Sequence, residues 1–131
     1  MARAVLLVDD NAVQAAVRQT ILKRDGFDVY AALSPLRALE QIVAGDFPVE
    51  VGLVLTDHLM PGMNGAEFVR KLRRLQPHLP VLVISGLEEA EQEYAGLNIV
   101  FRTKPLLPET LLSLVHQLLQ AERDGADLPA A

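Results

Sequence analysis

The sequence predicts a doubly wound α/β fold, with a five-stranded parallel sheet and helices on both of its faces. Short apolar segments alternate with helical segments five times along the 131 residues, a pattern typical of parallel strands joined by right-handed crossovers. The strand segments are apolar throughout rather than at every second residue, as expected of strands buried on both faces. A chain of this length can bury a core of its own as one domain.

The first strand is expected at Val5–Val8, and a helix follows from Asn11 to Asp25. The inward face of this helix is assigned to four apolar residues at helical spacing, which places Arg18 on another face; they are Val13, Val17, Ile21 and Leu22. The next helix begins after Ser34-Pro35, which reads as an N-cap followed by a proline at the first helical position.

The other strands follow as apolar segments bounded by glycine, proline or charged residues. They are expected at Phe27–Ala32, Val51–Thr56, Val81–Ile84 and Ile99–Phe101. A third helix is expected after the loop Met60–Gly65, a short acidic one at Glu88–Tyr94, and the last from Pro108. Residues 3–121 are predicted to form the domain, and residues 122–131 a C-terminal tail or linker.

The composition excludes several kinds of protein. The chain has no cysteine, which excludes a disulfide framework and a thiolate zinc site. It has no signal peptide pattern and no apolar run near the ~18 residues of a membrane span. Its net charge of −5 argues against nucleic acid as its own ligand. We therefore expect a cytoplasmic protein with no direct contact to membrane or nucleic acid.

Polar or charged residues lie at the carboxyl ends of the predicted strands, where functional crevices lie in such sheets. Asp9 and Asp10 follow the first strand, Asp57 the third, Ser85 the fourth and Lys104 the fifth. If the strands are neighbours, three carboxylates meet at one edge of the sheet. Like charges at that spacing repel unless a cation lies among them, so a lysine or a divalent metal ion is implied.

This ordered set of residues resembles the response regulator receiver domain of two-component signalling. The resemblance covers residues 3 to about 121 and rests on Asp9-Asp10, Asp57 with the Met60–Gly65 loop, Ser85-Gly86 and Lys104-Pro105. It implies the flavodoxin-like strand order 2-1-3-4-5. It also implies a phosphorelay in which Asp57 accepts a phosphoryl group from a kinase phosphohistidine, so the domain is a signalling phosphoacceptor rather than an enzyme.

The resemblance also implies a role for each residue. Mg²⁺ is the implied cofactor, with Asp9, Asp10, Asp57 and the Leu59 backbone carbonyl as its protein ligands. Lys104 pairs with a phosphate oxygen, Ser85 bonds another after phosphorylation, and Phe101 is the switch aromatic that moves inward. A cis peptide bond is implied at Lys104-Pro105. The implied partner is a histidine kinase or a histidine phosphotransfer domain, and the protein is expected to be a monomer or a weak dimer.

Simpler readings of single residues remain open. Asp9 and Asp10 could cap the first helix, and Phe101 could be an ordinary core residue. His58 follows Asp57 and so points to the opposite side of the strand, which favours an exposed His58 that ligates nothing. Two other functions also remain: a receiver-like interaction module without phosphorylation, and a small flavodoxin-like enzyme or nucleotide binder.

Three departures from the family pattern are informative. The stretch from Ser85 to Lys104 is short, so its helix must be short or partly unwound. Leu59 and Leu87 are apolar where receivers often carry polar residues that assist the dephosphorylating water. The loop Met63-Asn64-Gly65, Ser85-Gly86 and the short helix together are most similar to receivers of hybrid sensor kinases.

Overall fold

The computed structural model describes residues 3–124, with side chains described as far as residue 120. Five parallel strands form one sheet in the order β2-β1-β3-β4-β5. They are β1 (Ala4–Val8), β2 (Asp28–Ala32), β3 (Val51–Asp57), β4 (Val81–Ser85) and β5 (Val100–Thr103). The predicted fold class, strand number and strand order are confirmed.

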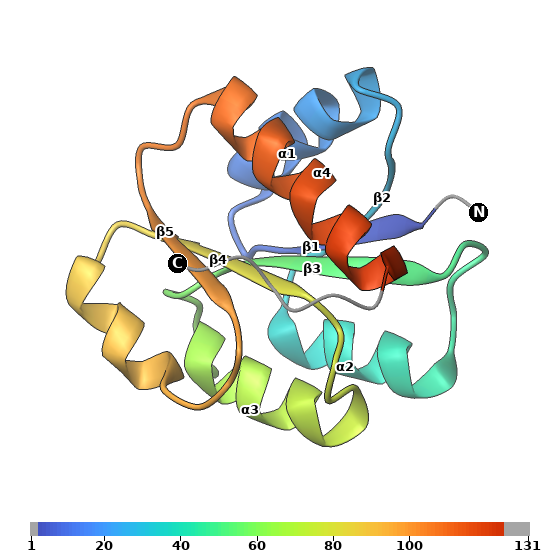
Figure 1. Cartoon of the computed structure of the whole chain (residues 1–131). Coiled ribbons are helices and arrows are strands. Elements are labelled where there is room, and N and C mark those ends of the chain that lie inside the picture. Colours follow the sequence, from blue (N-terminus) through green and yellow to red (C-terminus); the bar gives the residue numbers. More distant parts are fainter. Residues whose placement is uncertain (1–2, 125–131) are drawn as a thin grey trace.

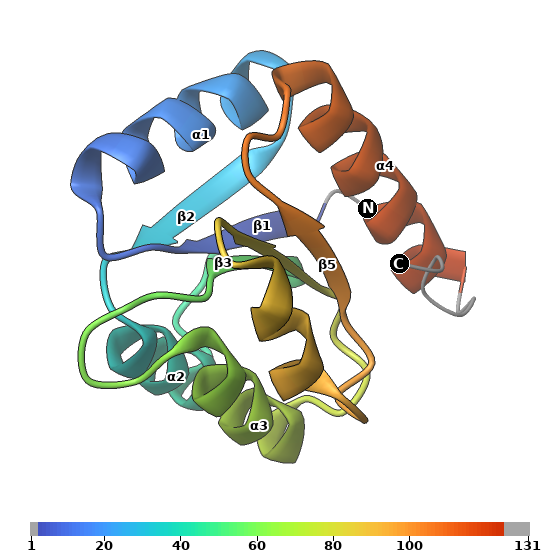
Figure 2. The same cartoon turned by 90° about the vertical axis from the view of Figure 1, so that its left-hand side faces the viewer.

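The helices cover both faces of the sheet (Figures 1 and 2). They are α1 (Ala12–Arg24), α2 (Pro35–Ala44), α3 (Gly65–Leu75), the 3₁₀ helix η1 (Glu88–Tyr94) and α4 (Pro108–Asp124). In Figure 1, α1 and α4 lie above the sheet and α2 and α3 below it. The core is correspondingly divided into two clusters, one around Phe68 and Leu72 and one around Leu22 and Leu118. Helix α4 continues to Asp124, three residues into the expected tail, and residues 125–131 lie outside the described part.

The start of α1 is fixed by Asn11 and not by the acids before it. The Asn11 side chain accepts a hydrogen bond from the Gln14 N–H, and the Asn11 N–H donates to Asp9 Oδ1 at 2.9 Å. Asn11, rather than Asp9 or Asp10, is therefore the N-cap, and Asp9 instead bonds the Gln14 and Arg18 side chains of α1.

The predicted inward face of α1 is right at Leu22 and at the partly buried Ile21, and wrong at Val13 and Val17. Its buried residues are Ala15, Arg18 and Leu22, whereas Val13 and Val17 are 75% and 54% exposed. Several faces of this helix carry apolar residues, so apolar spacing alone did not identify the face that meets the sheet. Small Ala15 lets the helix approach the sheet closely, and Arg18 is buried because it reaches a carboxylate.

The region between β4 and β5 is short and wound as a 3₁₀ helix, which confirms the expectation of a short or partly unwound helix. Arg73 of α3 supports it from below. Its guanidinium donates to the carbonyls of Leu97 at 2.8 Å and Leu79 at 2.6 Å, among others. Burial lowers the pKa of the Arg73 guanidinium.

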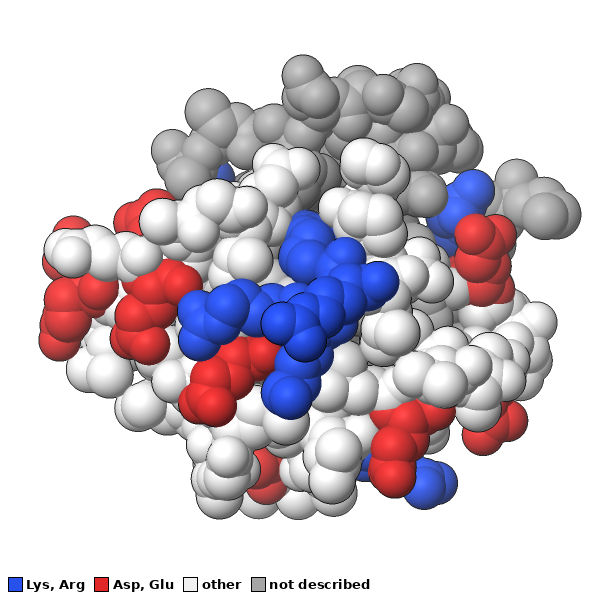
Figure 3. Space-filling model, turned by 90° about the horizontal axis from the view of Figure 1, so that it is seen from below, with Lys and Arg blue, Asp and Glu red and all other residues white. Residues whose placement is uncertain are grey.

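Charge is unevenly spread despite the net value of −5. Figure 3, seen from the side of α2 and α3, shows Lys and Arg gathered in the middle of this face with acidic side chains to either side. Helix α3 contributes Arg70, Lys71, Arg73 and Arg74 in its sequence, and η1 contributes four glutamates. Among the described residues, no helix combines the length and apolar character that crossing a membrane requires.

Candidate functional site

The sheet topology brings the strand-end residues to one edge. β1 lies between β2 and β3, so the strand order reverses next to β1, where ligands bind in folds of this kind. Val8 is in register with Thr56, which places Asp9 and Asp57 at neighbouring strand ends. Ser85 is in register with Thr103, so Lys104, the next residue in the chain, lies beside the end of β4.

Asp57 lies at the centre of this edge, 6% exposed. Its Oδ2 accepts hydrogen bonds from Lys104 Nζ at 2.6 Å and from Gln14 Nε2 at 3.0 Å. Its Oδ1 accepts from the His58 N–H at 2.7 Å. Burial by itself raises the pKa of Asp57, but Lys104, then Gln14 and the His58 N–H, outweigh it and hold the pKa below the usual range of a carboxyl. The group is an anion with fixed donors around it.

Asp9 is fully buried and shares a donor with Asp57. Its Oδ2 accepts from the same Gln14 Nε2 at 2.5 Å, and from Arg18 Nη1 at 3.5 Å. The Gln14 carbonyl oxygen accepts from Lys104 Nζ at 3.1 Å. Burial lowers the pKa of the Arg18 guanidinium, and the charges of Asp9 and Asp57 act against that shift. Two acids, two cations and one amide thus form a single network.

The sequence interpretation missed Gln14 and Arg18. Both lie on one face of α1, since they are four residues apart. Side chains of a helix lean toward its N-terminus, and the N-terminus of α1 lies beside Asp9. That spacing is the signal that could have identified them.

The other two predicted metal ligands, Asp10 and Leu59, lie at the surface. Among the three acids, the Gln14 amide joins Asp9 to Asp57. Within the described residues, no three His, Cys, Asp or Glu side chains stand close enough to hold a metal ion as they are. Mg²⁺ is commonly held by one or two carboxylates with waters. Asp9 and Asp57 suit that pattern, since both direct an oxygen at one point.

Ser85 is fully buried at the end of β4, and its hydroxyl oxygen accepts a hydrogen bond from the Leu87 N–H at 3.0 Å. The Ser85 carbonyl accepts from the Lys104 N–H at 2.8 Å, which joins the ends of β4 and β5. The peptide bond between Lys104 and Pro105 is cis, which confirms that prediction.

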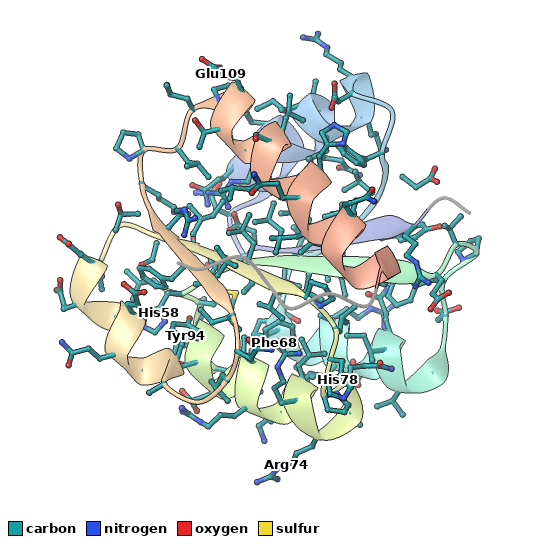
Figure 4. All side chains as sticks on the ribbon, viewed as in Figure 1. His58, Phe68, Arg74, His78, Tyr94 and Glu109 are labelled. Carbon is teal, nitrogen blue, oxygen red and sulfur yellow. The ribbon has the colours of Figure 1, made fainter. Side chains whose placement is uncertain are left out.

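The prediction that His58 is exposed is wrong. His58 is 3% exposed, with Nδ1 2.7 Å from Tyr94 Oη and Nε2 3.3 Å from a carboxylate oxygen of Glu93. Figure 4 shows His58 and Tyr94 pointing toward one another between β3 and η1. Side chains alternate along β3, so His58 points away from the side of Asp57, and the short η1 covers the side to which His58 points.

Phe101 is already buried, 4% exposed, with its ring 5.8 Å from that of Tyr94 between centroids. The inward position expected only after phosphorylation is therefore the one in this structure. Burial, with the charges of Glu93 and Asp57, raises the pKa of the Tyr94 hydroxyl, so it stays protonated and available to His58.

The sequence matches the family described as the response regulator receiver domain over residues 5–116. It is 36% identical over 113 residues, 82% of this chain, to the autoinducer 2 sensor kinase/phosphatase LuxQ of Vibrio cholerae, and that match covers 12% of LuxQ. It is 31% identical to the response regulator MprA of a Mycobacterium species, over 98% of this chain and 56% of MprA.

Two solved structures are similar to the whole fold. A CheY-like receiver domain protein of Methanospirillum hungatei superimposes with a TM-score of 0.85 at 22% identity, over 96% of this chain and 100% of that one. The chemotaxis protein CheY4 of Vibrio cholerae gives a TM-score of 0.78 at 27% identity, over 90% and 99% of the two chains. The chain spans between about a tenth and just over half of the curated relatives LuxQ and MprA.

Proposed function

This chain belongs to the family of response regulator receiver domains, and we propose that Asp57 is the carboxylate that accepts the phosphoryl group. The receiver is proposed to span residues 3–121 and the tail to begin at residue 122, with its first three residues continuing α4. The alternatives of a nucleotide binder and of an interaction module without phosphorylation are not favoured by the family match. The observation that carries the proposal is the contact of Lys104 Nζ with Asp57 Oδ2 at 2.6 Å, at the switch point of the sheet.

The reaction requires positioning more than covalent chemistry. An oxygen of Asp57 forms a bond to the phosphorus of a phosphohistidine, the bond from that phosphorus to the imidazole nitrogen breaks, and the leaving imidazole takes a proton. Asp57 is ionised and held by fixed donors, so its oxygen enters the reaction already oriented. Lys104 is close enough to Asp57 to donate a hydrogen bond to an oxygen of the transferred phosphoryl group and to offset its negative charge.

Ser85 supplies the second protein contact in this proposal. Its hydroxyl accepts from the Leu87 N–H, which leaves its own O–H free to donate to a phosphoryl oxygen. Its side chain must turn toward Asp57 for that bond, and the loop around Leu87 moves with it. Because Phe101 is already inward, we assign the first movement to this loop and keep Phe101 as a switch residue whose packing against Tyr94 responds.

We propose Mg²⁺ as the cofactor, held by Asp9, Asp10, Asp57 and the Leu59 backbone carbonyl. When bound, it supplies positive charge to the phosphoryl oxygens. We propose a cytoplasmic protein that receives its phosphoryl group from a histidine kinase or a histidine phosphotransfer domain. The exposed Val13 and Val17 on α1, next to the site, give such a partner apolar surface.

Replacement of Asp10 by Ala is expected to remove most of the Mg²⁺ affinity, and Asp57→Asn to weaken it, because each removes an anionic oxygen from the cation site. Isothermal titration of the purified chain with MgCl₂ measures both. Asp46→Asn, an exposed acid outside the site, is the matched control. Unchanged Mg²⁺ binding in Asp10→Ala would show that the cation site is elsewhere.

Loss of the phosphoryl group is expected to be slow. Leu59 and Leu87 flank the approach of water to Asp57 in the family pattern, and neither can orient that water. Leu59→Asn and Leu87→Glu should therefore each speed the decay of the phosphorylated protein. A time course in Mg²⁺ at fixed pH measures it. Decay of the wild type within seconds, or no change in either variant, contradicts this shielding.

A further inference from the structure

Arg18 is a charged side chain buried in the acid pocket. The residue is 9% exposed, and its partner Asp9 is not exposed at all. A buried charge is costly unless another charge and hydrogen bonds compensate it. Arg18 therefore needs an anionic partner, and its Nη1 lies 3.5 Å from Asp9 Oδ2.

Gln14 occupies the place between the two acids. Its Nε2 lies 2.5 Å from Asp9 Oδ2 and 3.0 Å from Asp57 Oδ2, and its Oε1 lies 3.1 Å from Lys104 Nζ. An amide N–H group carries a partial positive charge, so it reduces the repulsion between the two carboxylates. Two full cations, Arg18 and Lys104, complete the compensation for these two acids.

The network occupies one oxygen of each of the two acids that would hold a divalent cation. Asp9 Oδ2 accepts from both Gln14 and Arg18, and Asp57 Oδ2 accepts from both Gln14 and Lys104. A cation that bound these same two oxygens would have to displace the Gln14 amide. It would also have to share Asp9 with the Arg18 guanidinium, a charge of the same sign.

We propose that Arg18 and Gln14 form an internal counterion network that competes with the divalent cation for Asp9 and Asp57. Arg18 is thus a positioning residue that sets the metal affinity of this receiver and stabilises the acid pocket when no metal is bound. The proposal rests on the cation site proposed above, and it adds two residues of α1 that the sequence pattern of the site does not include.

The test compares Mg²⁺ binding and stability in the wild type and in Arg18→Met. Methionine keeps much of the length of the side chain and removes its charge. Isothermal titration with MgCl₂ should show binding about tenfold tighter in Arg18→Met, because a charged hydrogen bond no longer competes for Asp9. Gln14→Ala should also bind Mg²⁺ more tightly, and it tests the same network if Arg18→Met fails to fold.

Thermal unfolding in EDTA and in MgCl₂ separates this role from ordinary packing. Arg18→Met should lose stability mainly in EDTA, so the difference in melting temperature between the two conditions should widen. Arg73→Met is the matched control, since Arg73 is a partly buried arginine of α3 that binds the Leu97 and Leu79 carbonyls, on the other face of the sheet from α1. It should lower both melting temperatures and leave their difference unchanged.

The outcomes distinguish this inference from the proposed function. If Arg18→Met and Gln14→Ala bind Mg²⁺ as the wild type does while Asp10→Ala loses it, the cation site stands and the competition is refuted. Weaker Mg²⁺ binding in Arg18→Met also refutes the competition, since Arg18 would then support the metal. If Asp10→Ala binds normally as well, the cation site itself is refuted and this inference with it.

Discussion

Asp57→Asn is expected to abolish phosphoryl uptake. Incubation of the wild type with acetyl phosphate and Mg²⁺ should add the mass of one phosphoryl group, and the variant should add none. The reason is chemical, because an amide oxygen is a far weaker nucleophile than a carboxylate and forms no stable acyl phosphate. Intact-mass spectrometry measures the result directly.

The control for this experiment is Asp46→Asn, which removes an exposed acid and should phosphorylate as the wild type does. Lys104→Met gives a graded comparison. It keeps the nucleophile and removes the cation 2.6 Å away, so uptake should be slower by about 10²–10³-fold, as for loss of one preorganised donor. Full phosphorylation of Asp57→Asn would assign the acceptor to another residue and refute the proposed function.

Gly65→Ala is expected to destabilise the protein and slow its phosphorylation. Gly65 begins α3, and its N–H donates to the His58 carbonyl at 2.8 Å. A Cβ there would lie 2.6 Å from the Asp57 carbonyl oxygen and would also collide with Tyr94 Oη. Replacing glycine by alanine normally stabilises a helix by about 0.5–1 kcal/mol. Here the added Cβ overpacks against backbone, which costs about 1–3 kcal/mol. The net change should be destabilising.

The measurement is urea unfolding of the variant, with the rate of uptake from acetyl phosphate as a second readout. Gly86→Ala is the matched control, because its added Cβ meets open space, and its stability should change by no more than about 0.5 kcal/mol. Stability of Gly65→Ala equal to that of the control would show that β3 and α3 are not packed as closely as described.

Tyr94→Phe tests which contact causes the strain. By itself it leaves the buried His58 Nδ1 without its partner and should cost about 1–3 kcal/mol. Combined with Gly65→Ala it also removes one of the collisions, so the double variant should lose less stability than the sum of the two single changes. Additive losses would place the strain at the Asp57 carbonyl alone.

The sequence by itself determined the sheet and the strand-end residues. Apolar segments that end in charged residues are local features, and parallel strands necessarily present their carboxyl ends at one edge. Asp9, Asp57, Ser85 and Lys104 could therefore be identified by position in the chain. The short stretch from Ser85 to Lys104 likewise limits the helix between them, which is wound as 3₁₀.

Only the tertiary structure decided what surrounds those residues. Which face of α1 meets the sheet depends on the fit of Ala15 and on the ion pair of Arg18 with Asp9, and neither is a matter of apolar spacing. The burial of His58 depends on η1, whose Tyr94 closes over it. The contact of His58 with Tyr94 joins residues 36 positions apart and that of Gln14 with Asp57 joins residues 43 apart, so both depend on packing between distant elements of the chain.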